Sequence, residues 1–323
     1  MRPPYEQAPP QLAETGRVRR LLSSAVAPTG TLHHVARCTD GVPDTTADAV
    51  DRAGDRAAGQ DALLLIDQQL SLAATRLDRQ LTPARSGTLI RMVTQAGPGA
   101  FFCDSIVPGV HLIGALLPSD APQPGRQPLG RPEVDRGDEE LSRLASELRR
   151  LISLGSQDPG GFEHQGPASR PNDGPVRSIG NEQHRLSPLV RAALSPDDLH
   201  YLAYYEGEDL GFSVDILDHS ELAEFFSGIA VATRRRFYQE FGYEFGSVAG
   251  ELGRVVAPLI NGPLTRVVLD VEQGALYYLR VRRGEYLVGV TLNQWRVSHA
   301  DTRIDRLAAE CAATSRPATP NVD

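Results

Sequence analysis

Apolar residues in the second half of the chain recur at alternating steps of four and three, which predicts a long amphipathic helix. They are Phe237, Phe241, Phe245, Val248, Leu252, Val255 and Leu259. The first half repeats this seam with Leu63, Ile66, Leu70, Ala73, Leu77 and Leu81. Pro83 and Pro258 follow the seams at matching places, and each is expected to end its helix because proline cannot continue the helical hydrogen-bond ladder.

The regions around the second long helix predict β-hairpins. Three runs rich in β-branched and aromatic residues follow it, at 264–271, 275–282 and 286–292, separated by short turns that contain glycine. Gaps of this length require antiparallel pairing. Two further strands are expected at 199–205 and 210–216, and we interpret the acidic turn between them, with Glu206, Glu208 and Asp209, as solvated. Helices are expected at 16–27, at 187–194 and around Ile304 and Leu307.

Residues 87–118 align without a gap with residues 262–293 at a constant offset of 175 positions. Ten positions are identical, whereas a random pairing of this length gives roughly two. The matched pairs are Gly87/Gly262, Leu89/Leu264, Arg91/Arg266, Val93/Val268, Gly99/Gly274, Ala100/Ala275, Gly109/Gly284, Leu112/Leu287, Gly114/Gly289 and Leu117/Leu292. The chain is therefore interpreted as a tandem repeat.

The repeat and the Pro/Gly-rich stretches predict the domain organisation. We expect disordered tails at 1–15 and 313–323, a first unit at 16–154 with a loop insertion at 118–137, a linker at 155–186 and a second unit at 187–312. Each unit is expected to run helix, two strands, long helix, three strands, helix. Residues 44–60 are polar and alanine-rich, so whether the first unit retains its second strand is left open.

Short motifs agree with this order of elements: Thr39-Asp40-Gly41-Val42-Pro43, the turns at Gly274 and Gly284, and Tyr286-Leu287-Val288-Gly289-Val290. The chain resembles the Roadblock/dynein light chain family, in particular MglB-like members that accompany small Ras-like GTPases. The resemblance implies an α+β fold of two tandem profilin-like α/β sandwich units. Each unit would carry an antiparallel five-stranded sheet covered by helices, and the two would dock as an intramolecular pseudo-dimer.

Composition excludes several functions. A net charge of -8 and a pI near 5.5 argue against nucleic-acid binding. No lysine is present, which excludes a Walker A loop, a Schiff-base enzyme and a protein kinase. Cys38, Cys103 and Cys311 lack metal or disulfide spacing, and no apolar run is long enough to span a membrane. We therefore expect a cytoplasmic protein with reduced thiols and no membrane span.

No catalytic, cofactor or metal site is expected. His33 and His34 are adjacent on a strand, so their side chains should point to opposite faces and not share an ion. His200 matches His33 and is interpreted as a repeated packing or surface histidine. Cys103 and His111 match Tyr278 and Tyr286, which favours packing roles over nucleophilic catalysis.

Two groups of residues are candidates for contacts. Gly242, Gly246 and Gly250 recur every fourth residue on a predicted helix, where each costs about 1 kcal/mol relative to alanine. Their close neighbour is expected to be either the sheet of their own unit or the first unit's long helix, which carries the small residues Ser71 and Ala74. Arg234, Arg235 and Arg236 form either a solvated face or a contact with an acidic partner.

The resemblance implies a non-enzymatic regulatory or scaffold protein that presents a helix and sheet platform to a small Ras-like GTPase or a related signalling partner. A small-ligand sensor is the alternative, because domains of this shape often enclose a pocket. An enzyme of unrecognised type is the third hypothesis. Further self-association of the chain is left open.

Overall fold

The computed structural model describes residues 10–26, 31–49, 56–118, 129–155 and 168–314. It shows an α+β protein with one large antiparallel sheet and helices on both of its faces. None of the helices within these ranges is long and apolar enough to cross a membrane.

The described residues of the first half form three helices and five strands. In chain order they are α1 (Pro10–Ala25), β1 (His34–Thr39), β2 (Val42–Asp48), α2 (Arg56–Leu81), β3 (Leu89–Ala96), β4 (Ala100–Val107), β5 (Val110–Leu116) and α3 (Arg131–Leu151). A 3-10 turn at Thr82–Ala84, which contains Pro83, follows α2 at the place where the sequence predicts the helix to end.

The second half repeats this order after one additional strand. Its elements are β6 (Arg177–Gly180), α4 (Ser187–Ala192), β7 (Tyr201–Glu206), β8 (Asp209–Asp215), α5 (Val231–Val256), β9 (Leu264–Val271), β10 (Gly274–Arg282), β11 (Glu285–Thr291) and α6 (Val297–Thr314). Short 3-10 segments occur at Ser220–Phe226, before α5, and at Gln294–Arg296, before α6.

The eleven strands within the described ranges belong to one sheet, in the order β2-β1-β5-β4-β3-β9-β10-β11-β7-β8-β6. Counted outward from the centre, each half has the same connectivity: β3-β4-β5-β1-β2 on one side and β9-β10-β11-β7-β8 on the other. At the centre β3 pairs with β9, and Val93 lies opposite Val268, the residue that matches it in the repeat. One continuous sheet thus replaces the expected separate five-stranded sheets. The backbone N–H and C=O groups at the edge of each half pair with those of the other half.

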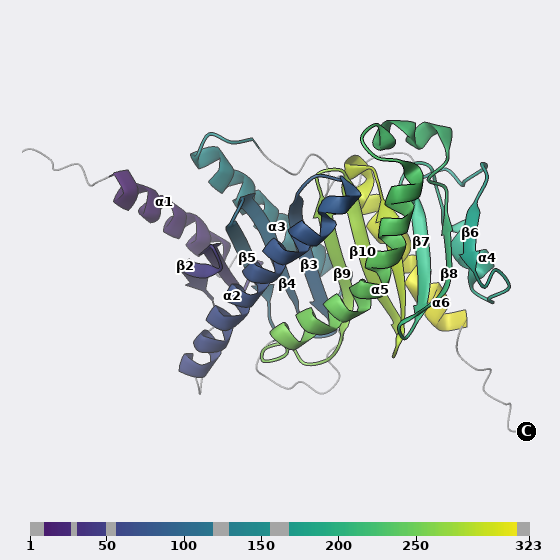
Figure 1. The fold of residues 1–323 in the computed structure, drawn as a ribbon. Helices are drawn as coiled ribbons and strands as arrows, with labels where there is room; N and C mark the ends of the chain where they lie inside the picture. Colours follow the sequence, from purple (N-terminus) through teal and green to yellow (C-terminus); the bar gives the residue numbers. More distant parts are fainter. Residues whose placement is uncertain (1–9, 27–30, 50–55, 119–128, 156–167, 315–323) are drawn as a thin grey trace, which may run out of the picture.

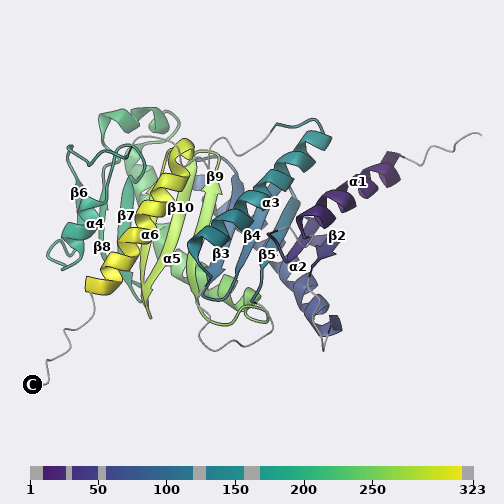
Figure 2. The same cartoon turned by 180° about the vertical axis from the view of Figure 1, so that it is seen from behind.

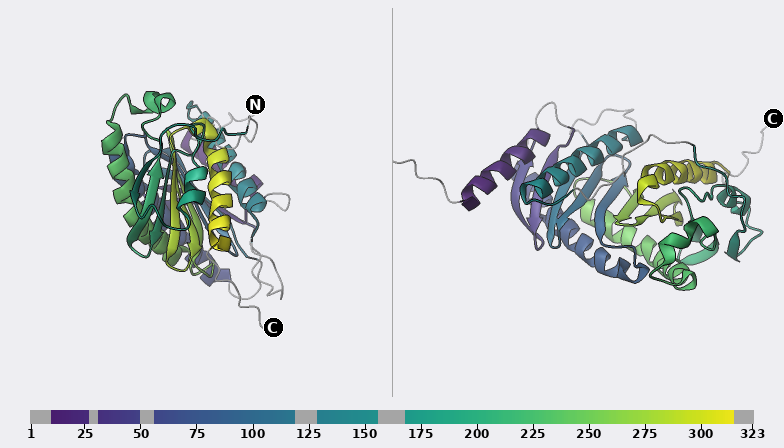
Figure 3. Two further views of the ribbon diagram at one scale, coloured as in Figure 1. Left: turned by 90° about the vertical axis from the view of Figure 1, so that its right-hand side faces the viewer. Right: turned by 90° about the horizontal axis from the view of Figure 1, so that it is seen from above.

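The helices divide between the two faces of the sheet. Figure 1 shows α2 and α5 side by side on one face, and Figure 2 shows α1, α3 and α6 across the other. The end-on and top views separate these layers clearly (Figure 3). Successive residues of a strand point to opposite faces and so belong to two separate hydrophobic cores. Tyr277 packs on the α6 side of the sheet and Tyr278 on the α5 side.

Three expectations about boundaries are corrected, and one question that the sequence left open is answered. Helix α1 begins at Pro10, inside the segment expected to be a disordered tail, and α3 begins at Arg131, inside the expected loop insertion. The doubtful strand of the first half is present as β2, an edge strand with mostly exposed side chains, so its polar composition is compatible with pairing. The expected linker contributes β6, which pairs with β8. The remaining parts of the expected tails, loop insertion and linker, at 1–9, 119–128, 156–167 and 315–323, lie outside the described residues.

Candidate functional site

The two long helices form a joint outer face of the molecule (Figure 1). Arg76 on α2 is 2.7 Å from Glu251 on α5, and these two positions are equivalent in the repeat. At the start of α5, Arg234 donates hydrogen bonds to the carbonyls of Ala84 (2.8 Å) and Arg85 (3.0 Å), directly after α2. The helices are therefore antiparallel neighbours, joined by this ion pair near the C-terminal end of each helix and by Arg234 at the start of α5.

The α2 part of this face exposes large apolar side chains. Leu64, Leu65 and Leu72 are 44%, 50% and 51% exposed, and Val42 in β2 is 59% exposed. Leu72 packs over Gly41, where an added Cβ would lie 2.8 Å from its side chain, so Val42 continues the same surface. We call these four residues the leucine patch. Exposed apolar residues grouped in this way are typical of protein interaction sites.

The predicted arginine group is mostly unavailable to a partner. Arg234 is 1% exposed and its third hydrogen bond goes to the Phe225 carbonyl (2.9 Å). Arg235 is 4% exposed and donates two bonds of 2.8 Å to Asp215. The partner-binding role is corrected for these two residues. Their buried guanidinium groups are already hydrogen bonded to neighbouring loops and strands and hold these against α5. Arg236 alone of the three is exposed.

The glycines of α5 contact their own half of the sheet. A Cβ added at Gly242 would lie 2.1 Å from the Tyr205 hydroxyl, and one added at Gly246 would lie 3.0 Å from the Tyr286 ring. Gly250 differs, since no atom of the described residues lies within 4 Å of a Cβ added there. Of the two alternatives left open by the sequence, the described contacts of Gly242 and Gly246 favour the sheet.

The small residues of α2 are both buried. Ser71 is hydrogen bonded to His111 of β5 at 2.9 Å, so it too contacts the sheet of its own half. Ala74 and its repeat counterpart Ala249 lie in the core beneath the two helices.

A buried ionic group lies under α2 that the sequence analysis did not identify. His34 is 1% exposed; its Nδ1 is 2.5 Å from Asp48, and its Nε2 is 2.9 Å from Asp67, which is fully buried. Burial lowers the pKa of His34, but the two carboxylates raise it by a larger amount. The pKa of His34 is therefore about 9, above its usual value of 6.5. The signal was present in the sequence: Asp67 occupies a position of the apolar seam between Leu63 and Leu70.

A second buried ionic group lies on the opposite face, at the junction of the halves. Arg91 of β3 forms an ion pair with Asp270 of β9 and lies 3.5 Å from Asp138 of α3. Its repeat counterpart, Arg266, donates a 3.1 Å hydrogen bond to Asp301 of α6. The space beside Arg91 is about 20 Å³, which is too small for a substrate, so this group is suited to fixing the register of the halves.

The adjacent histidines separate to opposite faces. His34 enters the ionic group under α2, whereas His33 Nδ1 accepts a 2.9 Å hydrogen bond from the Leu117 amide. His200 Nδ1 accepts the same bond, also 2.9 Å, from Leu292, the counterpart of Leu117. Among the described residues, no group of three or more His, Cys, Asp or Glu side chains is placed to hold a metal ion.

The three cysteines are free and buried. Burial is the main cause that raises the pKa of Cys38 and of Cys311 to about 12, and it raises that of Cys103 as well. A thiol protonated in this way is a poor nucleophile at neutral pH. The nucleophilic pair considered at Cys103 and His111 gains no support, because His111 is engaged by Ser71.

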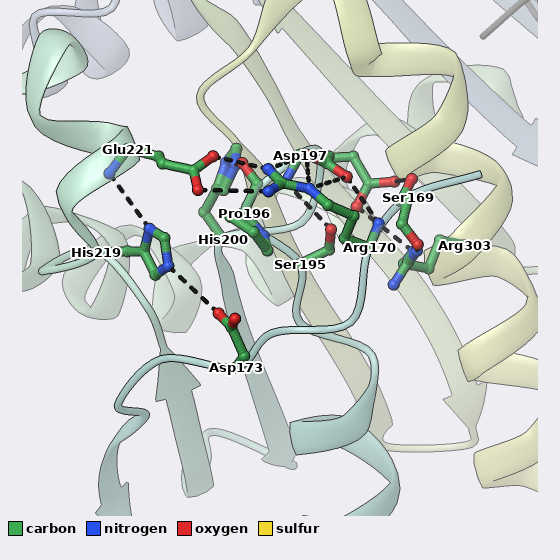
Figure 4. Close-up of polar contacts among 11 residues, drawn as sticks. Ser169, Arg170, Asp173, Ser195, Pro196, Asp197, His200, His219, Glu221 and Arg303 are labelled. Atoms are coloured by element: carbon green, nitrogen blue, oxygen red, sulfur yellow. Dashed lines mark hydrogen bonds and ion pairs between the residues drawn. The ribbon is translucent and has the colours of Figure 1, made fainter. Parts of the chain in front are cut away.

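A polar network attaches Ser169 and Arg170, which precede β6, to residues that precede β7 and α5 and to α6 (Figure 4). Arg170 donates hydrogen bonds of 2.7 Å to both Asp197 and Glu221. Asp198 is fully buried; Ser169 donates a hydrogen bond to it and Arg303 lies 3.4 Å from it. These charges largely neutralise one another, so we interpret the network as a structural attachment.

A hollow of about 600 Å³ lies next to this network, between α4 and α6. Leu189 and Ala193 line one side, and Thr302, Arg306 and Leu307 line the other. Its volume and mixed lining are compatible with a small polar ligand.

Neither a scan against protein-family models nor a search of the curated proteins finds a match for this chain.

Proposed function

We propose that this protein is a non-enzymatic regulatory or scaffold protein whose joint face of α2 and α5 binds a protein partner, a small Ras-like GTPase or a related signalling protein. The leucine patch is the observation that carries the proposal. The GTPase as partner rests on the resemblance to MglB-like Roadblock proteins.

The geometry of the face supports protein binding over small-molecule binding. The continuous sheet underlies both helices and makes the face broad and rigid, and the buried contacts of Arg234 and Arg235 fix α5 to its surroundings. Apolar anchors on a preorganised surface are the usual centre of a protein interface. Leu65 and Leu72 would be such anchors.

The proposal is tested with the Ras-like GTPases of the source genome, each loaded with GDP or with a non-hydrolysable GTP analogue. Calorimetry is expected to show nucleotide-dependent binding by the wild type and at least a tenfold loss in the Leu65→Asp/Leu72→Asp variant. Leu151→Asp is the matched control, since Leu151 is 41% exposed at the end of α3 on the other face. Absence of binding in both nucleotide states, or equal losses in the variant and the control, would contradict the proposal.

Small-ligand sensing is a second candidate, favoured by the hollow between α4 and α6. Differential scanning fluorimetry with panels of amino acids, nucleotides and organic acids would test it. A ligand of this hollow should raise the melting temperature of the wild type and lose affinity in an Arg306→Ala variant, because Arg306 lines the hollow and is exposed.

A further inference from the structure

A second hollow, of about 610 Å³, lies beside α5 on the face of the sheet that carries the two long helices. Tyr243 on α5, Tyr278 on β10 and Tyr286 on β11 supply its aromatic walls, and Glu208 and Glu244 supply its acidic groups. We call it the tyrosine hollow. The leucine patch is not part of its lining, so the inference below does not depend on the proposed partner.

Sequence differences between the halves open this hollow. Ser247 and Gly246 line it, and their repeat counterparts on α2 are Leu72 and Ser71. In the first half Leu72 covers Gly41 of the β1–β2 turn, and Ser71 is bonded to His111. In the second half the short Ser247 leaves the corresponding space beside Gly207 free, and Gly246 allows the Tyr286 ring to approach the helix.

The aromatic walls are fixed in place by stacking and hydrogen bonding. The Tyr286 ring lies 5.0 Å from that of Tyr278 and 4.9 Å from that of Tyr205, between ring centroids. The Tyr286 hydroxyl donates to the Gly242 carbonyl at 3.1 Å. Tyr278 is 8% exposed, and within the described part of the chain its hydroxyl makes no hydrogen bond, which leaves a polar group available at the hollow.

The charge of the lining is negative. Glu208 and Glu244 are its only charged residues, and no arginine or histidine belongs to the described lining. Arg280, on the same strand as Tyr278, donates its Nε hydrogen to the Arg282 carbonyl at 3.1 Å and is not part of the lining. Aromatic faces attract cations through their electron-rich π systems, and nearby carboxylates add to this attraction.

We propose that the tyrosine hollow binds an organic cation, in the form of a quaternary ammonium or a guanidinium group. The Tyr243 and Tyr286 rings would contact the cationic head, Glu244 and Glu208 would balance its charge, and the Tyr278 hydroxyl would accept a hydrogen bond from a guanidinium. A compact inorganic cation would gain little from the rings, because it keeps a strongly held water shell.

The test titrates the full-length chain with three probes and follows their proton NMR signals. Tetramethylammonium represents a free quaternary ammonium, N-acetyl-arginine methylamide represents an arginine side chain, and neopentyl alcohol is an uncharged probe of similar shape to the first. Saturable binding of at least one cation is expected, with its methyl or methylene signals shifted upfield by the tyrosine rings. The cation that binds more tightly identifies the source of the ligand.

Variants distinguish the hollow from unspecific attraction to an acidic protein. Ser247→Leu introduces the residue of the other half and should abolish saturable binding, whereas Glu244→Gln should weaken it roughly threefold to tenfold. Glu240→Gln is the control, since Glu240 is an exposed acid on α5 outside the lining. Equal affinity for the uncharged probe, unchanged binding in Ser247→Leu, or no saturable binding of either cation would overturn the proposal.

Discussion

The two halves of the sheet share their connectivity but fill the layer between long helix and sheet with different kinds of side chain. Under α2, the first half buries an ionic group around His34 and Asp67. Under α5, the second half has Tyr201 and Gly242 at the matching positions and fills the space with aromatic rings. Connectivity alone therefore does not dictate whether the layer between helix and sheet is ionic or aromatic.

The largest expected effect comes from removing the buried carboxylate of the first half. Asp67→Ala would leave His34 buried with only the partly exposed Asp48 as partner, and we expect the free energy of unfolding to fall by about 3–5 kcal/mol. Asp61→Ala, an exposed acid on the same helix, should change it by less than about 0.5 kcal/mol. Urea denaturation measures both, and similar values for the two variants would show that the ionic group does not stabilise α2.

The two halves should respond to pH in opposite directions through His34 and His200. The folded pKa of His34, about 9, lies above its unfolded value of 6.5, so its stabilisation is present below pH 6.5 and is lost as the pH rises to 9. Burial is the main cause that lowers the pKa of His200 to about 4, so its neutral form stabilises the fold above pH 6.5 and this is lost as the pH falls to 4. Each effect is on the order of 3 kcal/mol.

Denaturation at several pH values separates these contributions. In the His34→Gln variant the free energy of unfolding should fall less between pH 6.5 and 9 than in the wild type. In the His200→Gln variant it should fall less between pH 6.5 and 4. If His34→Gln retained the wild-type slope above pH 6.5, the buried group would not be ionised as described.

Intermediate effects are expected at the glycines of α5. Gly242→Ala would force a methyl group against the Tyr205 hydroxyl and should lower the free energy of unfolding by about 1–3 kcal/mol. Gly250→Ala meets no neighbour in the part of the chain that the structure describes, and it should raise the free energy of unfolding by about 0.5–1 kcal/mol through helix propensity. Destabilisation by both substitutions would point to a neighbour at Gly250, such as a bound partner chain.

The smallest effect is expected where equivalent positions of the halves meet. Arg76 and Glu251 are 40% and 44% exposed, so their ion pair should contribute less than about 0.5 kcal/mol in a double-mutant cycle with Arg76→Ala and Glu251→Ala. A larger coupling would show that the contact between α2 and α5 depends on this pair more than on the core beneath it.

Periodicity was sufficient to predict the elements that carry strong local signals. The expected strand at 275–282 is β10 to within one residue, and both long helices end beside the prolines that were expected to stop them. Edge strands were harder, because β2 and β6 each pair on one side and need no apolar run. The repeat alignment included Arg91 and Arg266, yet their burial follows from the pairing of β3 with β9, a long-range contact that local patterns do not encode.

The candidate surfaces depended even more on tertiary structure. The arginine run on α5 has an ordinary surface composition, and only the positions of Asp215 and Ala84 in space explain why Arg234 and Arg235 are buried. The separation of His33 from His34 was predictable from strand geometry, whereas their partners were not.

The junction of β3 with β9 within a single chain has an evolutionary consequence. A homodimer built from one short chain must accept every substitution twice, once on each side of its axis. Here a mutation alters one side only, so an aspartate at position 67 and a glycine at position 242 can coexist. The two halves can therefore evolve different functions independently of each other.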